Sequence, residues 1–141
     1  MGRQVSFGFD AERIMKQEEI IETIHRYLDA CNKFDIDKMM KVLAPDIRFE
    51  NFSGGQVNAK TSGKTEFEVL AGQSARLFIS RKQTVRTIKI EGDSAFAEIE
   101  FEGLLAQDLP NGLKAGETLA LGGTSEFLFR DGLISSIIDK S

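Results

Sequence analysis

The chain has 141 residues, of which 41% are hydrophobic and 28% charged, and its formal net charge is −4. This length favours a single domain, and the composition is that of an ordinary globular protein. The modest negative charge, spread along the chain, argues against a nucleic-acid partner, and no apolar run is long enough to cross a membrane.

Scarce cysteine and histidine limit the chemistry further, because the chain contains one of each, Cys31 and His25. A lone cysteine cannot form an internal disulfide, which fits a reducing cytoplasm. The same scarcity argues against a zinc site, and no glycine-rich phosphate loop points to a nucleotide. We therefore expect a cytoplasmic protein without a metal or cofactor.

Helical periodicity dominates the first part of the chain. Residues 1–10 read as a flexible arm and residues 11–141 as a single domain, with Asp10 as a suitable N-cap. An amphipathic helix of roughly 20 residues should follow. Its apolar arc consists of Ile20, Ile21, Ile24, Tyr27, Leu28 and Cys31.

A short second helix is expected at residues 36–43, capped by Asp35 and ended by Pro45. Residues 46–51 then read as a strand, and residues 52–63 as a polar loop.

A third helix is expected next, because Thr65 and Glu68 have the spacing of a capping box. Apolar and small residues recur there at helical intervals, at Phe67, Leu70, Ala71, Ser74, Leu77 and Phe78.

After Phe78 the apolar period changes to two, which is the period of a strand. Strands are predicted at residues 81–90, 94–105, 114–130 and 133–140, with glycine-containing turns between them. Helices followed by a run of long adjacent strands predict an antiparallel sheet with helices on one face, an α+β fold.

Alternation along residues 94–105 sorts the charges into faces. Glu98, Glu100 and Glu102 share one face, which we expect to be solvated or turned to a second subunit. If Ile90 pairs with Ala95, Thr87 comes opposite Glu98, and the glutamates point away from the core.

In that register Arg86 shares a face with Ile88 and Ile90. It then either points inward, where it needs an anionic partner, or sits in a bulge that lets it reach water. The sequence leaves both alternatives open.

Two polar side chains are candidates for a buried site. Asp139 alternates with Ile137 on the last strand, so it is either a buried carboxylate or a surface residue, depending on which face turns inward. Tyr27 lies at the edge of the apolar arc of the first helix, where its hydroxyl would serve a pocket or an ordinary structural hydrogen bond.

The order and spacing of these segments resemble the nuclear transport factor 2-like superfamily, closest to its SnoaL-like and ketosteroid-isomerase-like members. The resemblance covers about residues 14–140 and rests on IHRYLDACNKFDIDKMMKVLAPDIRFEN, SGKTEFEVL, IEGDSAFAEI and FLFRDGLISSIIDK. It implies a cone-shaped curved sheet wrapped around the first helix, an apolar pocket between them, and a homodimer through the outer sheet face.

In ketosteroid-isomerase-like members, a helix-one Tyr and a late-strand Asp donate to an oxyanion, and an Asp at the end of the first strand is the base. The matching positions here are Tyr27, Ser125 and Asn51. An amide cannot take up a proton, so steroid-isomerase chemistry would require another base, Glu50 or Asp139.

Limonene-epoxide-hydrolase-like members hold a water with a Tyr and an Asn and use a last-strand Asp as base. Asn51 and Asp139 match two of these positions, Phe49 stands in place of the Tyr, and the Arg-x-Asp pair is missing. Polyketide-cyclase-like members also use a pocket acid, for which Asp139 is the candidate.

We therefore expect a pocket for a small apolar ligand, with Asp139 as base and with Tyr27 and Asn51 as hydrogen-bonding residues. The remaining predicted ligand-binding residues are Phe49, Phe52, Arg86, Ile88, Ile99, Phe101, Leu119 or Leu121, and Ser125. The alternative is a non-catalytic module that binds a ligand, or has a filled interior, and dimerises or docks a partner through its outer face.

Overall fold

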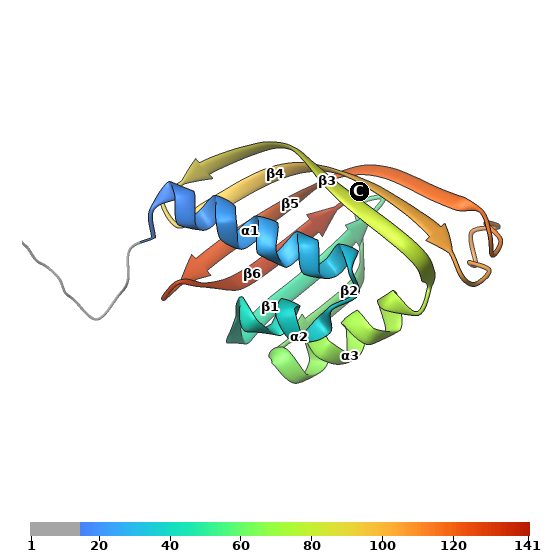
Figure 1. Cartoon of the computed structure of the whole chain (residues 1–141), viewed down its shortest axis with the longest axis horizontal. Helices are drawn as coiled ribbons and strands as arrows, with labels where there is room; N and C mark the ends of the chain where they lie inside the picture. The colour runs from blue at the N-terminus through green and yellow to red at the C-terminus, as the bar shows by residue number, and fades with distance from the viewer. Residues whose placement is uncertain (1–14) are drawn as a thin grey trace, which may run out of the picture.

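A computed structural model describes residues 15–141, so the predictions for the arm at residues 1–10 and for Asp10 lie outside the described residues. The described chain forms three helices and six strands, which confirms the α+β class (Figure 1). The elements are α1 (Gln17–Asn32), α2 (Ile36–Lys41), β1 (Leu43–Ser53), β2 (Gln56–Ser62), α3 (Lys64–Ala75), β3 (Phe78–Glu91), β4 (Ser94–Leu105), β5 (Thr118–Arg130) and β6 (Leu133–Lys140). None of the helices within residues 15–141 could span a membrane.

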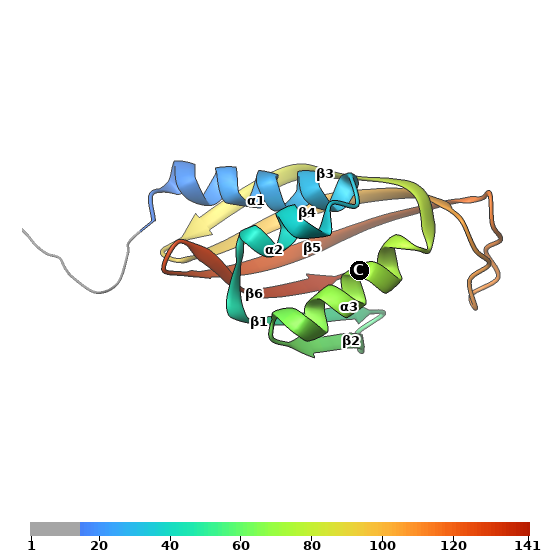
Figure 2. The ribbon, with the colours of Figure 1, turned by 60° about the horizontal axis from the view of Figure 1, so that its bottom comes forward.

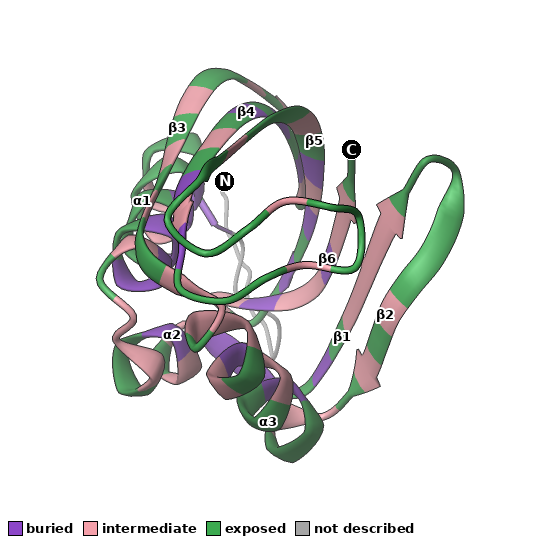
Figure 3. Ribbon diagram, turned by 90° about the vertical axis from the view of Figure 1, so that its right-hand side faces the viewer, coloured by how far each residue is buried: buried purple, intermediate pink, exposed green. Residues whose placement is uncertain are grey.

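The six strands form one curved sheet in the order β2-β1-β6-β5-β4-β3. Neighbours pair antiparallel except for β1 and β6, which are parallel, so the sheet is mixed rather than wholly antiparallel. A parallel pair needs a long connection, and here α3 and four strands lie between β1 and β6 along the chain. The helices cover the concave side of the sheet (Figures 2 and 3).

The first helix is shorter than its periodicity predicts, because it begins at Gln17. Glu19 accepts a hydrogen bond from the backbone N–H of Lys16 at 3.0 Å, which satisfies one of the free donors at the helix start. Ile20 and Ile24 are completely buried and Tyr27 is 6% exposed, so most of the predicted apolar arc faces the sheet. Ile21, which was also predicted to belong to this arc, is instead 38% exposed.

The two following helices differ in how they begin. Asp35 caps α2 as predicted, accepting from the backbone N–H of Lys38 at 3.1 Å. The predicted capping box of α3 is wrong: Gly63 is the N-cap and Thr65 is already inside the helix. Glu66 therefore occupies the third helical position and accepts from the N–H of Ser62 at 2.8 Å.

The segment predicted as a polar loop forms a hairpin, which corrects the reading of residues 52–63. Gly54 and Gly55 have φ values of +59° and +82°, a conformation that suits a tight hairpin turn and that glycine adopts without strain. The sequence of β2 lacks a recognisable strand pattern because β2 is an edge strand with one face in water and is rich in polar residues.

The register of β3 and β4 is the predicted one, with Ile90 opposite Ala95 and Thr87 opposite Glu98. A bulge between Val85 and Thr87 leaves Arg86 on the outer surface, where it forms a 2.9 Å ion pair with Glu100. The inward alternative for Arg86 is therefore wrong, because the bulge reverses the alternation at that point.

Candidate functional site

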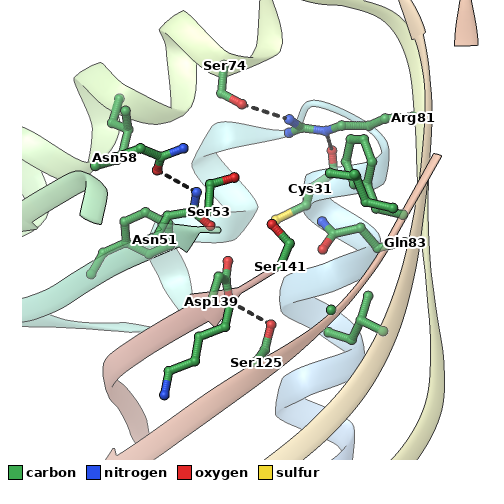
Figure 4. Close-up of a pocket in the computed structure, with 18 of the residues that line it drawn as sticks. Cys31, Asn51, Ser53, Asn58, Ser74, Arg81, Gln83, Ser125, Asp139 and Ser141 are labelled. Atoms are coloured by element: carbon green, nitrogen blue, oxygen red, sulfur yellow. Dashed lines mark hydrogen bonds between the residues drawn. The ribbon is translucent and has the colours of Figure 1, made fainter. Parts of the chain in front are cut away.

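An open cavity of about 690 Å³ lies on the concave side of the sheet, between the C-terminal half of α1 and α3 (Figure 4). The cavity lies between the two helices because α3 packs against β1 and β2, whereas α1 packs against β3. Its walls are mainly apolar, from Phe49, Phe67, Leu70, Ile99, Phe101 and Leu119. A mostly apolar cavity with a few convergent polar groups is typical of small-ligand sites.

Asp139 is the acidic side chain of this cavity among the described residues. It sits opposite Ser125 across the β5–β6 pair, and the buried Ser125 hydroxyl donates to Asp139 Oδ1 at 2.6 Å. Burial raises the pKa of the Asp139 carboxyl to about 6, and the hydrogen bond from Ser125 partly opposes this shift by favouring the charged form.

Asn51 lies directly beside Asp139, because the two residues are register partners in the parallel β1–β6 pair. Its amide nitrogen donates to Asn58 Oδ1 at 2.6 Å, which orients the side chain at the cavity wall. A primary amide has two N–H groups, so one donor remains for a ligand.

Tyr27 and Cys31 face the cavity from successive turns of α1, and their hydroxyl and thiol groups are hydrogen-bond partners. Burial raises the pKa of the Cys31 thiol to about 12 and raises that of Tyr27 well above its ordinary value. Both groups therefore stay protonated at neutral pH. Cys31 is therefore not a thiolate nucleophile, and the Tyr27 hydroxyl remains a hydrogen-bond donor.

Arg81 is a cavity residue that the sequence reading missed. Its Nε donates to the backbone oxygen of Cys31 at 2.7 Å, and Nη1 donates to Ser74 Oγ at 3.4 Å. The guanidinium lies 4.7 Å from the centroid of the Phe34 ring. Alternation in the segment RKQTV could have revealed it, since Arg81 and Gln83 share a face with the half-buried Val85.

Most, but not all, of the predicted residues meet in this cavity. Tyr27, Asn51 and Asp139 line it together with Phe49, Ile99, Phe101, Leu119, Leu121 and Ser125. Phe52, Arg86 and Ile88 do not. Phe52 alternates with Asn51 and so faces the other side of the sheet, whereas Ile88 packs against the core.

No group of three or more His, Cys, Asp or Glu side chains within residues 15–141 could hold a metal ion. The cavity contains hydrogen-bonding and titratable groups of its own, above all one carboxyl group set in apolar surroundings.

Comparison with known families agrees with this geometry. Residues 24–137 match the family model of the SnoaL-like domain. This match covers most of the chain, which therefore belongs to the SnoaL-like family. No curated protein sequence matches the chain.

Solved structures with the same fold resemble the chain over most of its length. TsrD from Streptomyces laurentii superposes with a TM-score of 0.74 at 22% identity, covering 89% of each chain. A candidate SnoaL-like polyketide cyclase from Jannaschia sp. CCS1 gives 0.74 at 18% identity, over 94% of this chain and 90% of that one. An LEH-like epoxide hydrolase of M. tuberculosis gives 0.69 at 17% identity, over 87% and 82%. Identities this low show a shared fold.

Proposed function

We propose that this protein is a SnoaL-like enzyme that moves a proton on an apolar carbonyl or ring compound, with Asp139 as the general base. The observation that carries the proposal is the carboxyl of Asp139 in an apolar cavity, with a pKa of about 6. A carboxylate with this pKa is mostly ionised at neutral pH and is a stronger base than an exposed aspartate.

Ser125 supports this role by holding Asp139 in place. Its hydrogen bond engages Oδ1, and the other carboxylate oxygen can then accept a proton from a carbon atom next to a carbonyl group. The bond between that carbon and its hydrogen breaks, its electron pair forms the enolate, and the proton passes to Asp139.

The negative charge that develops on the substrate oxygen needs donors nearby. The free N–H of Asn51 and the hydroxyl of Tyr27 both belong to the cavity wall, and Asn51 is adjacent to Asp139. Donors held in an apolar site stabilise such an oxyanion more strongly than water does. Tyr27 would have to turn from Cys31 toward the substrate, or share its proton between them.

The enolate has two outcomes that this site could serve. Return of the proton from Asp139 to a different carbon isomerises the substrate. Alternatively, attack of the enolate carbon on a second carbonyl closes a ring, and the alkoxide formed on that carbonyl takes up the proton from Asp139. The likeness to a candidate polyketide cyclase supports the second outcome, which uses the same base.

Proton exchange provides a test that does not require the natural substrate. Cyclic ketones such as 2-tetralone are incubated in D₂O, and deuterium uptake next to the carbonyl is followed by NMR. Asp139→Asn should lower the catalysed exchange rate by about 10²–10⁴-fold, the usual contribution of a positioned base.

Glu102→Gln is the matched control, because Glu102 is an exposed carboxylate on the outer face of β4. It should leave exchange unchanged. If Asp139→Asn exchanges deuterium as fast as the unaltered protein, Asp139 is not the base.

A non-catalytic ligand-binding module is the alternative, and the existing hydrogen bonds of Tyr27 to Cys31 and of Asn51 to Asn58 favour it. It predicts ligand binding with no exchange in any variant.

The homodimer stays a prediction in either case. The exposed Phe96 and Leu128, which are 42% and 40% accessible on the outer face, are where it would form.

A further inference from the structure

Arg81 differs from the other arginines that the structure describes. The remaining ones within residues 15–141 are all exposed, and three of them pair with carboxylates on the surface. Arg81 is half-buried in the cavity wall, and no carboxylate of the described residues forms an ion pair with it. An unpaired cation in such a position is costly unless something compensates it.

The neutral contacts of Arg81 fix the direction of the side chain but leave its charge unpaired. Its Nε is held by the Cys31 carbonyl oxygen, near the C-terminal end of α1, and Nη1 reaches Ser74 on α3. A guanidinium has five N–H donors, and these two bonds use two of them. The side-chain amide of Gln83, two residues along β3, also lines the cavity beside this group.

Arg81 and Asp139 lie in different parts of the same cavity. Figure 4 shows Cys31 between them, with Arg81 reaching toward Ser74 and Asp139 paired with Ser125. A ligand that touches both would pass Cys31, and its middle would contact the apolar walls.

We infer that the ligand is an acid: its carboxylate binds Arg81, with Ser74 and Gln83 beside it, while its carbonyl-bearing end faces Asp139. This inference rests on the proposed function for the assignment of the reacting end. A carboxylate matches the planar fork of the guanidinium and supplies the missing negative charge. Gln83 and Ser74 can donate further hydrogen bonds to the same oxygens.

Binding of a charged and an uncharged version of one probe tests the inference. The probes are naphthalene-2-carboxylate and naphthalene-2-carboxamide, and their fluorescence can be titrated directly because the chain contains no Trp. The unaltered protein should bind the carboxylate about tenfold or more tightly than the amide, as expected for hydrogen bonds to a charged group. The preference should shrink as salt is added.

Arg81→Gln should remove the preference for the carboxylate and leave the affinity for the amide nearly unchanged. Arg76→Gln is the matched control, because Arg76 is exposed, lies outside the cavity lining and loses the same charge. Equal affinity of the unaltered protein for the two probes, or equal losses in the two arginine variants, would overturn the inference.

Ser74→Asp provides a second test of the inference if Arg81→Gln fails to fold. Its carboxylate would lie next to Arg81, because Ser74 Oγ is already 3.4 Å from Nη1. The variant should lose affinity for naphthalene-2-carboxylate, keep its affinity for the amide, and retain or raise its thermal midpoint. Ser74→Asn is the uncharged control, and unaltered carboxylate binding by Ser74→Asp would contradict the inference.

The binding assay also separates this inference from the proposed function, since it involves no turnover. Asp139→Asn should retain the preference for the carboxylate while losing proton exchange. Loss of the preference with intact exchange rejects the acid ligand alone. Exchange that persists in Asp139→Asn, with an intact preference, rejects the role of Asp139 alone.

Discussion

The two ends of the concave face are built from the same elements, yet one is solid and the other hollow. At the closed end, α1, β5 and β6 contribute Ile24, Phe127 and Ile134, all completely buried. At the open end, the same three elements contribute Cys31, Ser125 and Asp139 to a cavity of about 690 Å³.

The change happens within two residues on each strand. Phe127 gives way to Ser125 on β5, and Ile137 gives way to Asp139 on β6. Large apolar side chains fill the closed end to the density of a protein core, whereas smaller and polar side chains leave room at the open end. Stability should therefore reside mainly at the closed end, and the residues of the cavity can vary with little effect on the fold.

Truncation of one phenylalanine at each end should show this difference most strongly. Phe127→Ala should lower the free energy of unfolding by about 3–5 kcal/mol, because it leaves a cavity among fully buried neighbours. Phe101→Ala, at the half-buried cavity wall, should cost about 1–2 kcal/mol, since less area is lost from the core. Urea unfolding measures both, and equal losses would contradict the comparison.

The second-largest effect is expected in the pH dependence of stability, which should reveal the buried carboxyl at the open end of the concave face. The pKa of Asp139 is raised in the folded state, so protonation of its carboxyl stabilises the folded protein. This stabilisation is fully present below the unfolded-state pKa near 3.8 and is lost as the pH rises through the folded-state pKa of about 6. The unfolding free energy of the unaltered protein should therefore fall relative to that of Asp139→Asn, by up to roughly 3 kcal/mol.

An opposite sign is expected for an exposed carboxylate that is already paired. Arg130 lowers the pKa of Asp46, so the stability that this carboxylate provides is lost as the pH falls. Comparing Asp46→Asn with Asp139→Asn across the same pH range in urea checks both directions. Parallel curves for Asp139→Asn and the unaltered protein would show that the Asp139 carboxyl is solvated like an ordinary one.

The smallest effect on stability is expected for Tyr27, where the two ends meet. Tyr27→Phe keeps the ring packed edge-on against Phe127, at 6.2 Å between centroids, and removes only the hydroxyl. The unfolding free energy should fall by about 1 kcal/mol or less, the worth of one hydrogen bond. Deuterium exchange should slow, though less than in Asp139→Asn, and an unchanged rate would make the hydroxyl purely structural.

Local patterns in the sequence predict much of the scaffold. Period-two alternation locates β3, β4, β5 and β6, and the turn between β3 and β4 sets their register, including the outward glutamates. Patterns that depend on one end residue are less reliable. The start of α3 shifts by two positions relative to the predicted capping box, and this shift replaces Glu68 by Glu66 at the helix start.

The candidate site was only partly predictable for a related reason. Alternation assigns a residue to a face of a strand but does not say what covers that face. Ile88 and Ile99 both face inward, yet Ile88 packs against the core and Ile99 lines the cavity. Arg81 was missed because alternation extended back from Ile88 without the bulge at Arg86 assigns it to the outer face, although its own alternation with Val85 is unbroken.

The sequence by itself determined the class of fold, the amphipathic face of α1 and the alternation of the long strands, because these depend on neighbours a few residues apart. Only the tertiary structure decided that β1 lies parallel to β6, which brings Asn51 next to Asp139, and that α1 and α3 leave a cavity above them. Contacts between distant segments depend on how the whole sheet curves and packs, and local periodicity does not specify this curvature or packing.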